Sequence, residues 1–351
     1  MRLKLLIGCY SDDNHKEALH LLEFDNFNKL FELLGSHHVP NPSYLVFSPD
    51  SSVIYTVNEN HTTKDKLSAI QLNLATAEFK NVNQISAEGS DPCYISIDSK
   101  AKHVFAANYT DGTLCCASIN KNGALGYPVQ VISHKRDSLD QLHPKTHIHA
   151  TVLSPNEDFL LVTNLGQDTI TVYRYQPNNL AKPLDDTPFS IFDLSVGAGP
   201  RHLRFSENGK YVYVVGELDA SLHVLSWENG NLKPIQVLKL MPDDYQGENS
   251  AADLHFGTGG KFLYISNRGD ANQIIIFKVD ILTGKAELLQ RSATNGLGPR
   301  NFAISPSGDF MIIAHQHSND LRVFEIDKNL GTINDTGIGY ALHSPVCVQF
   351  L

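Results

Sequence analysis

Apolar and polar residues alternate along this chain in short runs that come in groups of four. In the group that begins at Pro200, an alternating run at 202–205 leads through a polar turn to a continuous apolar run at 211–215. A third run occupies 221–225, and a fourth follows a Gly-containing turn at 234–238. Runs rich in β-branched and aromatic residues, separated by Asn, Gly, Pro and Asp, predict strands joined by tight turns. The continuous second run predicts a strand that is covered on both faces.

The same group of four runs recurs along the whole chain at intervals of 46 to 56 residues. The repeats begin at Pro42, Pro92, Ile148, Pro200, Ala251, Pro299 and Pro345. Four strands in each repeat at this period are typical of the blades of a β-propeller, and no segment has a capped helical period. The sequence therefore predicts an all-β fold, a seven-bladed β-propeller with four-stranded antiparallel blades, as one domain over residues 1–351.

The two ends of the chain complete this prediction. The last repeat supplies only one strand, VCVQFL at 346–351, whereas the N-terminus supplies three further runs at 4–10, 19–24 and 31–38. We expect these four strands to form the seventh blade, with one strand from the C-terminus and three from the N-terminus. Such a blade closes the ring and leaves no open sheet edge between the first and last blades.

Composition narrows the range of partners and compartments. The formal net charge of −10 argues against nucleic acid or an anionic membrane as the main partner. The five cysteines are odd in number and none form a CxxC pair, which favours reduced thiols over a disulfide or zinc framework. The apolar run at the N-terminus is too short for a signal peptide, and none is long enough to span a membrane. We expect a cytoplasmic protein that is a monomer or a weak homodimer.

The repeat also predicts which residues converge. In a propeller blade, the start of the first strand and the end of the second lie on one face near the axis. The first-strand starts are Ser43, Cys93, His149, Arg201, Ala252, Arg300 and Val346. The second-strand ends are Asn58-Glu59, Asn108-Tyr109, Asn164-Leu165, Gly216-Glu217, Asn267-Arg268 and His315-Gln316. The asparagine that four repeats share fits a structural role, with its side chain bonded to local backbone.

Six residues at these two offsets differ from one repeat to the next and predict a polar pocket. They are His149, Arg201, Glu217, Arg268, Arg300 and Gln316. Arginine forks suit a carboxylate or a phosphate, so we expect a small anionic ligand. A glutamate among cations can remain ionised as a base, and a histidine can pass protons near neutrality.

The residues favour acid–base chemistry without a cofactor. The chain has no GxSxG, CxxC or HExxH motif. His147-x-His149 and His315-x-His317 each place two imidazoles on one strand face, but without a nearby acidic third ligand, so we expect no metal. His147 is otherwise expected to support the site from behind.

Two polar insertions lengthen the connections into first strands. They are 135–144 before the third complete blade and 241–250 before the fifth. Long loops in compact repeats often form lids or rims of functional sites, and plain surface insertion is the alternative.

Several local motifs resemble the bacterial lactonase family. They are THIHA at 146–150, GPRH at 199–202, VGEL at 215–218, YQGENSAADLHF at 245–256, SNRG at 266–269 and PVCVQFL at 345–351. This family consists of seven-bladed propellers typified by 6-phosphogluconolactonase and is related to fungal carboxymuconate lactonizing enzyme. The resemblance covers essentially the whole chain. It implies that His149, Arg201, Glu217 and Arg268 form the catalytic and substrate-binding set. Gly216 stands where the family usually has Asn, which is expected to loosen the positioning of Glu217.

The implied reaction is hydrolysis of 6-phosphogluconolactone to 6-phosphogluconate, a step of the pentose phosphate pathway. Either Glu217 or His149 would activate water, while Arg201 and Arg268 would hold the phosphate or stabilise the oxyanion. Further substrate contacts are expected from Arg300, Gln316, His147, His202 and Asn267. Two alternatives stay open: lactone chemistry on a carboxymuconate-like dicarboxylate, and a propeller without catalytic activity that serves as a binding platform.

Overall fold

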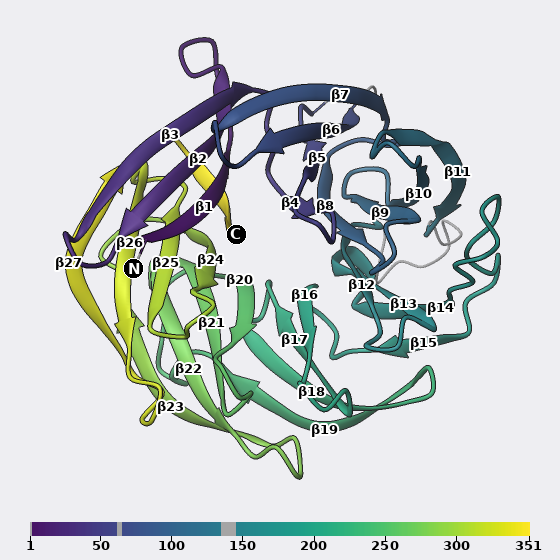
Figure 1. Cartoon of the computed structure of the whole chain (residues 1–351). Helices are drawn as coiled ribbons and strands as arrows, with labels where there is room; N and C mark the ends of the chain where they lie inside the picture. The colour runs from purple at the N-terminus through teal and green to yellow at the C-terminus, as the bar shows by residue number, and fades with distance from the viewer. Residues whose placement is uncertain (1, 62–64, 135–144) are drawn as a thin grey trace. The chain divides into compact units, whose positions relative to one another are not determined.

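The computed structural model describes residues 2–61, 65–134 and 145–351. Strands β1 to β28 of these residues form seven four-stranded sheets, accompanied by one 3-10 turn at Leu165–Gln167 (Figure 1). The chain divides into two compact units. Unit 1 comprises Met1–Ile7, Leu22–Glu32 and Leu194–Leu351, and unit 2 comprises Gly8–Leu21 and Leu33–Asp193. No helix in the described ranges is long and apolar enough to cross a membrane.

Unit 2 contains three complete sheets, each formed by four consecutive strands. The first consists of β4 (Leu45–Phe47), β5 (Val53–Asn58), β6 (Lys66–Asn73) and β7 (Glu78–Ser86). The second consists of β8 (Pro92–Ile97), β9 (His103–Asn108), β10 (Thr113–Ile119) and β11 (Leu125–Ser133). The third consists of β12 (Ile148–Leu153), β13 (Phe159–Asn164), β14 (Thr169–Arg174) and β15 (Ser190–Asp193).

Unit 1 contains three more sheets with the same strand order. The first consists of β16 (Pro200–Phe205), β17 (Tyr211–Gly216), β18 (Ser221–Glu228) and β19 (Asn231–Lys239). The second consists of β20 (Asn249–Phe256), β21 (Phe262–Gly269), β22 (Gln273–Val279) and β23 (Ala286–Ala293). The third consists of β24 (Pro299–Ile304), β25 (Phe310–His315), β26 (Asp320–Ile326) and β27 (Ile333–Ala341).

The seventh sheet joins the two ends of the chain, as the sequence predicts. Its strand order is β28-β1-β2-β3, so the C-terminal strand pairs with the first strand of the N-terminus. The strands are β1 (Arg2–Cys9), β2 (Glu17–Asp25), β3 (Leu30–His38) and β28 (Pro345–Phe350). One C-terminal and three N-terminal strands therefore build this blade.

The hydrophobic pattern explains which strands are buried. All six residues are buried in β5, β9, β13 and β25, the second strands whose continuous apolar runs predict cover on both faces. Fourth strands such as β7 and β19 are largely exposed. In unit 1, Tyr213 and Leu222 of one sheet pack with Leu254, Leu263 and Ile275 of the next. The core of this unit therefore lies between the faces of consecutive sheets.

Buried tyrosines connect two such pairs of consecutive sheets in unit 1. The hydroxyl of Tyr213 in β17 donates to the carbonyl of Gly284, 2.6 Å away in the turn between β22 and β23. Tyr264 in β21 donates in the same way to Gly331, at 3.0 Å. Both glycines have positive φ, at 74° and 78°, and a Cβ at Gly331 would lie 2.2 Å from the ring of Phe262. These turns need glycine for their conformation and for the close approach of the preceding sheet.

Candidate active site

Five of the seven first strands have a β-bulge at the offset where the sequence predicts the pocket. In β24, Pro299 faces His315 and Asn301 faces Ala314, so one residue between them is extra. The same shift occurs in β8, β12, β16 and β20. A bulge redirects the side chains of its extra residues. The bulges contain Cys93, His149, Arg201 with His202, Ala252 with Asp253, and Arg300.

In unit 1, Arg201, Glu217 and Arg268 form one ion-pair cluster. Nε of Arg201 lies 3.0 Å from Oε2 of Glu217, and Nη2 of Arg268 lies 2.8 Å from Oε1. The side chains are 3%, 19% and 13% exposed, in the order Arg201, Glu217, Arg268. The structure therefore brings together three of the four residues that the resemblance implies, with the glutamate held between two arginines.

The cluster keeps Glu217 ionised. Burial by itself would raise the pKa of this carboxyl, but the charges of Arg268, Arg201 and Arg300 and a hydrogen bond from Ser250 lower it below its usual 4.5. Burial lowers the pKa of the Arg268 guanidinium, with Arg201 and Arg300 adding to the shift and Glu217 opposing it. Three cations against one carboxylate leave this site with a positive charge, which suits an anionic ligand.

Arg268 reaches the cluster because its hairpin is longer than the others in this unit. Strands β20 and β21 have eight residues each, whereas β16, β17, β24 and β25 have six. In the added part, Ser250 pairs with Arg268, whose Nε donates to the Ser250 carbonyl at 3.1 Å. The Ser250 hydroxyl donates to Oε1 of Glu217, also at 3.1 Å.

Ser250 is a site residue that the repeat offsets miss. The signal that could have found it is the insertion at 241–250, which ends on this serine. Its contact with Glu217 favours the interpretation of this insertion as part of the site. The other insertion, 135–144, lies outside the described residues.

The shared asparagines bind backbone, as predicted, although the partners are distant in sequence. Nδ2 of Asn58 donates to the Pro40 carbonyl at 2.9 Å, and Nδ2 of Asn108 donates to Ala87 at 2.8 Å. Oδ1 of Asn267 accepts from the Ser250 amide at 3.2 Å. Each partner lies where the chain enters or begins the first strand of the same sheet, so the asparagine fixes that entry. In Asn267 this contact positions Ser250, and its Nδ2 donates to Asn249.

Gly216 does not leave Glu217 loose. A Cβ at Gly216 would lie 2.5 Å from Oδ1 of Asp219 and 2.8 Å from the Ala198 carbonyl, so neighbouring groups fill the space of the family's asparagine. The Glu217 amide donates to Gly199 at 2.8 Å, and both carboxylate oxygens have partners. The expected loosening is wrong for this reason.

The remaining predicted contacts in unit 1 differ in their surroundings. Arg300 is half-buried in the bulge of β24, and its charge acts on both Glu217 and Arg268. Gln316 follows β25 in a turn, where its backbone N–H donates to the Gly298 carbonyl at 2.9 Å. His202 is buried, with Nδ1 2.8 Å from Oδ1 of Asp253 and Nε2 3.2 Å from Nη1 of Arg201. His202 thus connects Arg201 to the buried carboxylate of Asp253.

His149 and His147 lie in unit 2 beside Tyr109. The ring of His147 stacks on Tyr109 with centroids 4.4 Å apart, and its Nδ1 lies 3.0 Å from the Tyr109 carbonyl. His149 is buried, and its ring forms a T-shaped pair with the ring of Tyr109, with centroids 5.7 Å apart. Tyr109 therefore packs against both predicted histidines.

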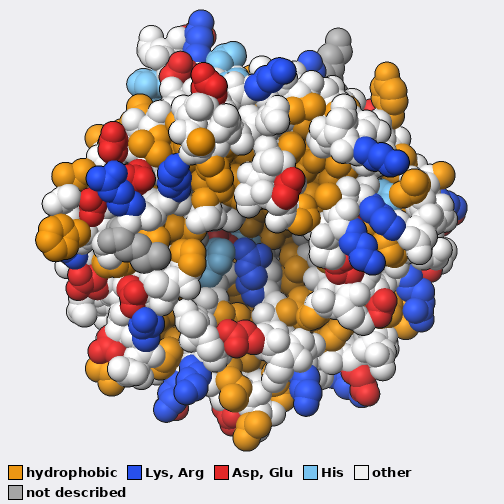
Figure 2. Space-filling model, viewed as in Figure 1, with side chains coloured by type: hydrophobic (Ala, Val, Ile, Leu, Met, Phe, Trp, Pro, Cys, Tyr) orange, Lys and Arg blue, Asp and Glu red, His pale blue; other side chains and the backbone are white. Residues whose placement is uncertain are grey.

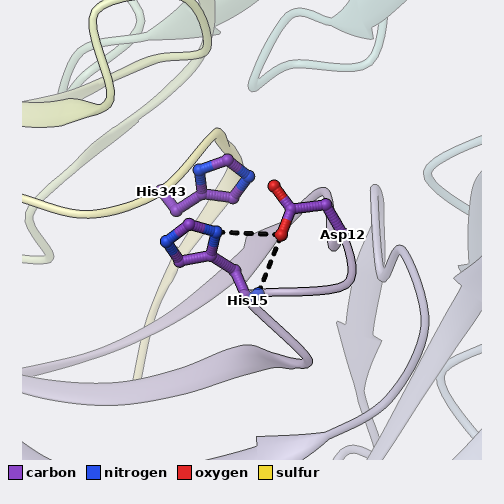
Figure 3. A group of neighbouring side chains, drawn as sticks. All are labelled: Asp12, His15 and His343. Carbon is purple, nitrogen blue, oxygen red and sulfur yellow. Dashed lines mark hydrogen bonds and ion pairs between the residues drawn. The ribbon is translucent and has the colours of Figure 1, made fainter.

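Neither histidine pair predicted from sequence gathers a third ligand atom among the described residues. In the loop between β1 and β2, Oδ1 of Asp12 accepts from the His15 amide at 2.8 Å and lies 2.9 Å from its Nδ1 (Figure 3). Both side chains are about half exposed, and such a surface pair contributes little to stability.

Surface charge agrees with a small ligand. Figure 2 shows basic and acidic side chains interspersed over one face, without an extended basic patch. This mixed pattern accompanies a formal net charge of −10 over the whole chain.

Comparison with known proteins identifies the family. Residues 4–350 match the family described as "Lactonase, 7-bladed beta-propeller". The chain is 27% identical over 348 residues to 6-phosphogluconolactonase of Bacillus subtilis, which covers 98% of this chain and 97% of the relative. It is 30% identical over 337 residues to 6-phosphogluconolactonase of Formosa agariphila, covering 94% of each. The structure of the periplasmic gluconolactonase PpgL from Pseudomonas aeruginosa has a TM-score of 0.94 and 32% identity, covering 100% of this chain and 99% of the other.

Seven four-stranded sheets and a cluster of two arginines and a glutamate thus define a β-propeller with a polar site. This chain belongs to the lactonase family of seven-bladed β-propellers. Both the predicted fold class and the resemblance drawn from the sequence motifs are confirmed.

Proposed function

We propose that this protein hydrolyses a phosphorylated sugar lactone, 6-phosphogluconolactone, to 6-phosphogluconate. The observation that carries the proposal is the Arg201–Glu217–Arg268 ion-pair cluster with Arg300 acting on it, a cationic site in a member of the lactonase family. Two curated relatives carry the name 6-phosphogluconolactonase. By this proposal the protein acts in the pentose phosphate pathway.

In the reaction, water gives up a proton to a base as it adds to the lactone carbonyl, and the addition yields a tetrahedral oxyanion. The carbon–oxygen bond of the ring then breaks, and the ring oxygen leaves as a hydroxyl after it takes up a proton. Arg201 and Arg268 supply fixed guanidinium donors for the phosphate or for the oxyanion. Donors that are already held in place stabilise the developing charge without reorganisation.

We assign Glu217 mainly to the positioning of the arginines. Its oxygens are engaged by Arg201, Arg268 and the Ser250 hydroxyl, and its pKa is lowered by these cations. A carboxylate of low pKa is a weak proton acceptor at neutral pH. For His149, the support for a catalytic role is the family resemblance, and we expect His149→Gln to reduce kcat by about 100-fold, the usual scale for a general base.

Replacement of Arg201 is the direct test. Turnover of freshly prepared lactone is measured against spontaneous hydrolysis, for the wild type, Arg201→Ala and Arg201→Lys. We expect Arg201→Ala to lower kcat/KM by about 1000-fold, and Arg201→Lys to retain part of it because lysine keeps the charge but loses the fork. Ser43→Ala, at the same repeat offset, is the matched control and should behave as the wild type. Near wild-type turnover by Arg201→Ala would refute the assignment.

The substrate class is tested by comparing three compounds. The cationic cluster favours the phosphorylated lactone over the uncharged gluconolactone. Gluconolactone is the substrate class that the name of the Pseudomonas relative indicates for that protein. We expect the higher kcat/KM for the phosphorylated lactone. A higher value for gluconolactone would remove the phosphate from the proposal, and turnover of carboxymuconate instead would favour the dicarboxylate alternative, since two arginines also suit two carboxylates.

We also propose a cytoplasmic location, where the phosphorylated substrate is formed. The Pseudomonas relative, by contrast, is named as a periplasmic protein. Cell fractionation with antibody detection separates the two compartments, and recovery in the periplasmic fraction would contradict the proposal.

A further inference from the structure

A belt of buried polar side chains lies behind Arg201 in unit 1. It comprises His202 of β16, Asp253 of β20 and Asn301 of β24, the residues at or next to the bulges of three consecutive first strands. All three are at most 2% exposed. His202 bonds to one oxygen of Asp253, and Nδ2 of Asn301 donates to the other. Oδ1 of Asn301 accepts from the Val348 amide of β28 at 2.7 Å, so the belt extends to the C-terminal strand.

Asp253 is the centre of this belt. Besides His202 and Asn301, Nε2 of His255 lies 2.8 Å from Oδ2, and the Leu254 amide donates to Oδ1 at 2.9 Å. Burial alone would raise the pKa of this carboxyl, but the neighbouring His255 and the hydrogen bonds from His202 and His255 hold it well below its usual value. A buried carboxylate is costly unless its acceptor positions are filled, and four donors fill them here. An apolar side chain would stabilise a β-sheet core at lower cost, so this charge calls for another explanation.

The connection to the site runs through the ring of His202. Burial and the neighbouring Arg201 lower the pKa of His202 to about 3, so the imidazole is neutral. A neutral imidazole has one donor and one acceptor nitrogen. Because Nδ1 faces the carboxylate of Asp253, Nδ1 carries the proton and Nε2 accepts. Nη1 of Arg201 lies 3.2 Å from this Nε2 and 3.4 Å from Nδ1, so of the two ring nitrogens it is Nε2, the acceptor, that lies nearer to the guanidinium. Nη1 also donates to the Ala252 carbonyl at 2.6 Å.

We propose that Asp253 is a positioning residue that acts through His202, fixing the tautomer that accepts from Arg201 and so the plane of its guanidinium. Asp253 and Glu217 then hold Arg201 from opposite ends, through Nη1 and Nε. A guanidinium that is already held in one orientation loses little rotamer entropy when it binds an anion. That Arg201 binds substrate rests on the proposed function.

A pair of His202 variants separates positioning from folding. In His202→Gln, the amide can donate to Asp253 and accept from Arg201, whereas His202→Leu does neither. His223→Leu is the matched control, since His223 is also buried but lies on β18 outside the belt. The measurements are Tm, kcat/KM for the lactone, and the affinity for inorganic phosphate by calorimetry.

We expect both His202 variants to lose thermal stability, as His223→Leu also should. Phosphate affinity and kcat/KM should fall at least 10-fold further in His202→Leu than in His202→Gln, and His223→Leu should retain both. Equal losses in the two His202 variants would overturn the proposal and leave the belt with a purely structural role.

The tautomer is tested directly and without turnover. In ¹⁵N spectra of the imidazoles, with His202 assigned by the signal that His202→Gln lacks, we expect a neutral ring protonated at Nδ1 from pH 5 to 9. A proton on Nε2, or titration near pH 6.5, would overturn the proposal. Should the wild type fail to hydrolyse the lactone while phosphate affinity and the tautomer follow the expectation, the proposed function fails and the positioning role stands.

Asp253→Asn provides a second variant. Loss of the charge should weaken the preference for the Nδ1 tautomer and lower phosphate affinity. An Asp253→Asn protein that folds with an unchanged tautomer and unchanged phosphate affinity would count against the proposal. If this variant does not fold, the two His202 variants decide.

Discussion

The hairpins β20–β21 and β24–β25 are equivalent parts of two consecutive repeats. The residue at the same repeat offset, Arg268 in the first and Gln316 in the second, nevertheless lies in different surroundings. In β24–β25, the strands have six residues and pairing begins at Pro299 and His315, so Gln316 falls in the turn that follows. In β20–β21, pairing begins farther out, and Arg268 lies within the strand opposite Ser250. Strand length therefore decides whether the residue at this offset contacts Glu217 or caps a turn.

Breaking the longer hairpin's contact should give the largest effect. Arg268→Ala removes the ion pair to Oε1 of Glu217 and one cation of the site. We expect kcat/KM for the lactone to fall by about 1000-fold, equivalent to about 4 kcal/mol of transition-state stabilisation. Gln316→Ala, the same offset in the shorter hairpin, should cost less than about 10-fold. Equal losses of kcat/KM in the two variants would contradict the claim that only the longer hairpin places this residue in the site.

Removing the charge that both arginines share should have the next largest effect. Glu217→Gln keeps the shape, and we expect kcat/KM to fall by about 100-fold because Arg201 and Arg268 lose their common anion. The pKa of Glu217 is lowered in the fold, so its ionised form stabilises the protein above pH 4.5 and this contribution is lost as pH falls further. Denaturant unfolding between pH 3 and 7 should thus have a smaller acid dependence in the variant. An identical pH dependence would contradict the ion-pair interpretation.

Restoring the family's asparagine tests the packing around Gly216. Gly216→Asn places a Cβ within 2.5 Å of Asp219 and Ser221, so we expect a loss of about 1–3 kcal/mol in the free energy of unfolding. Gly216→Asn combined with Asp219→Gly should recover part of it, since that space is then vacated. If Gly216→Asn alone is as stable as the wild type, the side chains of Asp219 and Ser221 must move away without cost.

The smallest effect is expected where the longer hairpin meets the carboxylate. Ser250→Ala removes one hydrogen bond to Oε1 of Glu217 while the arginine partners stay. We expect kcat/KM to fall by about 3- to 10-fold, on the scale of one hydrogen bond to a charged group. Ser250→Thr keeps a hydroxyl and should recover most of the activity. A Thr variant no better than Ala would mean that the hydroxyl itself contributes little.

The asparagines illustrate how far a sequence repeat goes. Their recurrence predicts a backbone contact, and Asn58, Asn108 and Asn267 make one. The partners lie 17 to 21 positions away, at the entry to the paired first strand, because antiparallel pairing places that entry beside the end of the second strand. The sequence pattern contains the periodicity but not the residue that lies opposite.

The architecture and the charged residues at the repeat offsets could be predicted from the amino-acid sequence alone. Hydrophobic alternation and turn residues repeat seven times, and a repeated pattern leaves few folds that bury every apolar face, so the strands and the terminal blade follow from it. The repeat offsets also singled out Arg201, Glu217 and Arg268, because these residues differ from those at the same offset in the other repeats. How these residues act on one another depends on contacts that form in the folded chain.

Two features depended on that tertiary structure. The bulges direct Arg201 toward Glu217 and His202 toward Asp253, although the two residues are neighbours in sequence. Ser250 contacts Glu217 across 33 positions of sequence, and Asp253 contacts His202 across 51 positions. Such contacts depend on the pairing register and on packing between sheets, neither of which a local pattern of residues specifies.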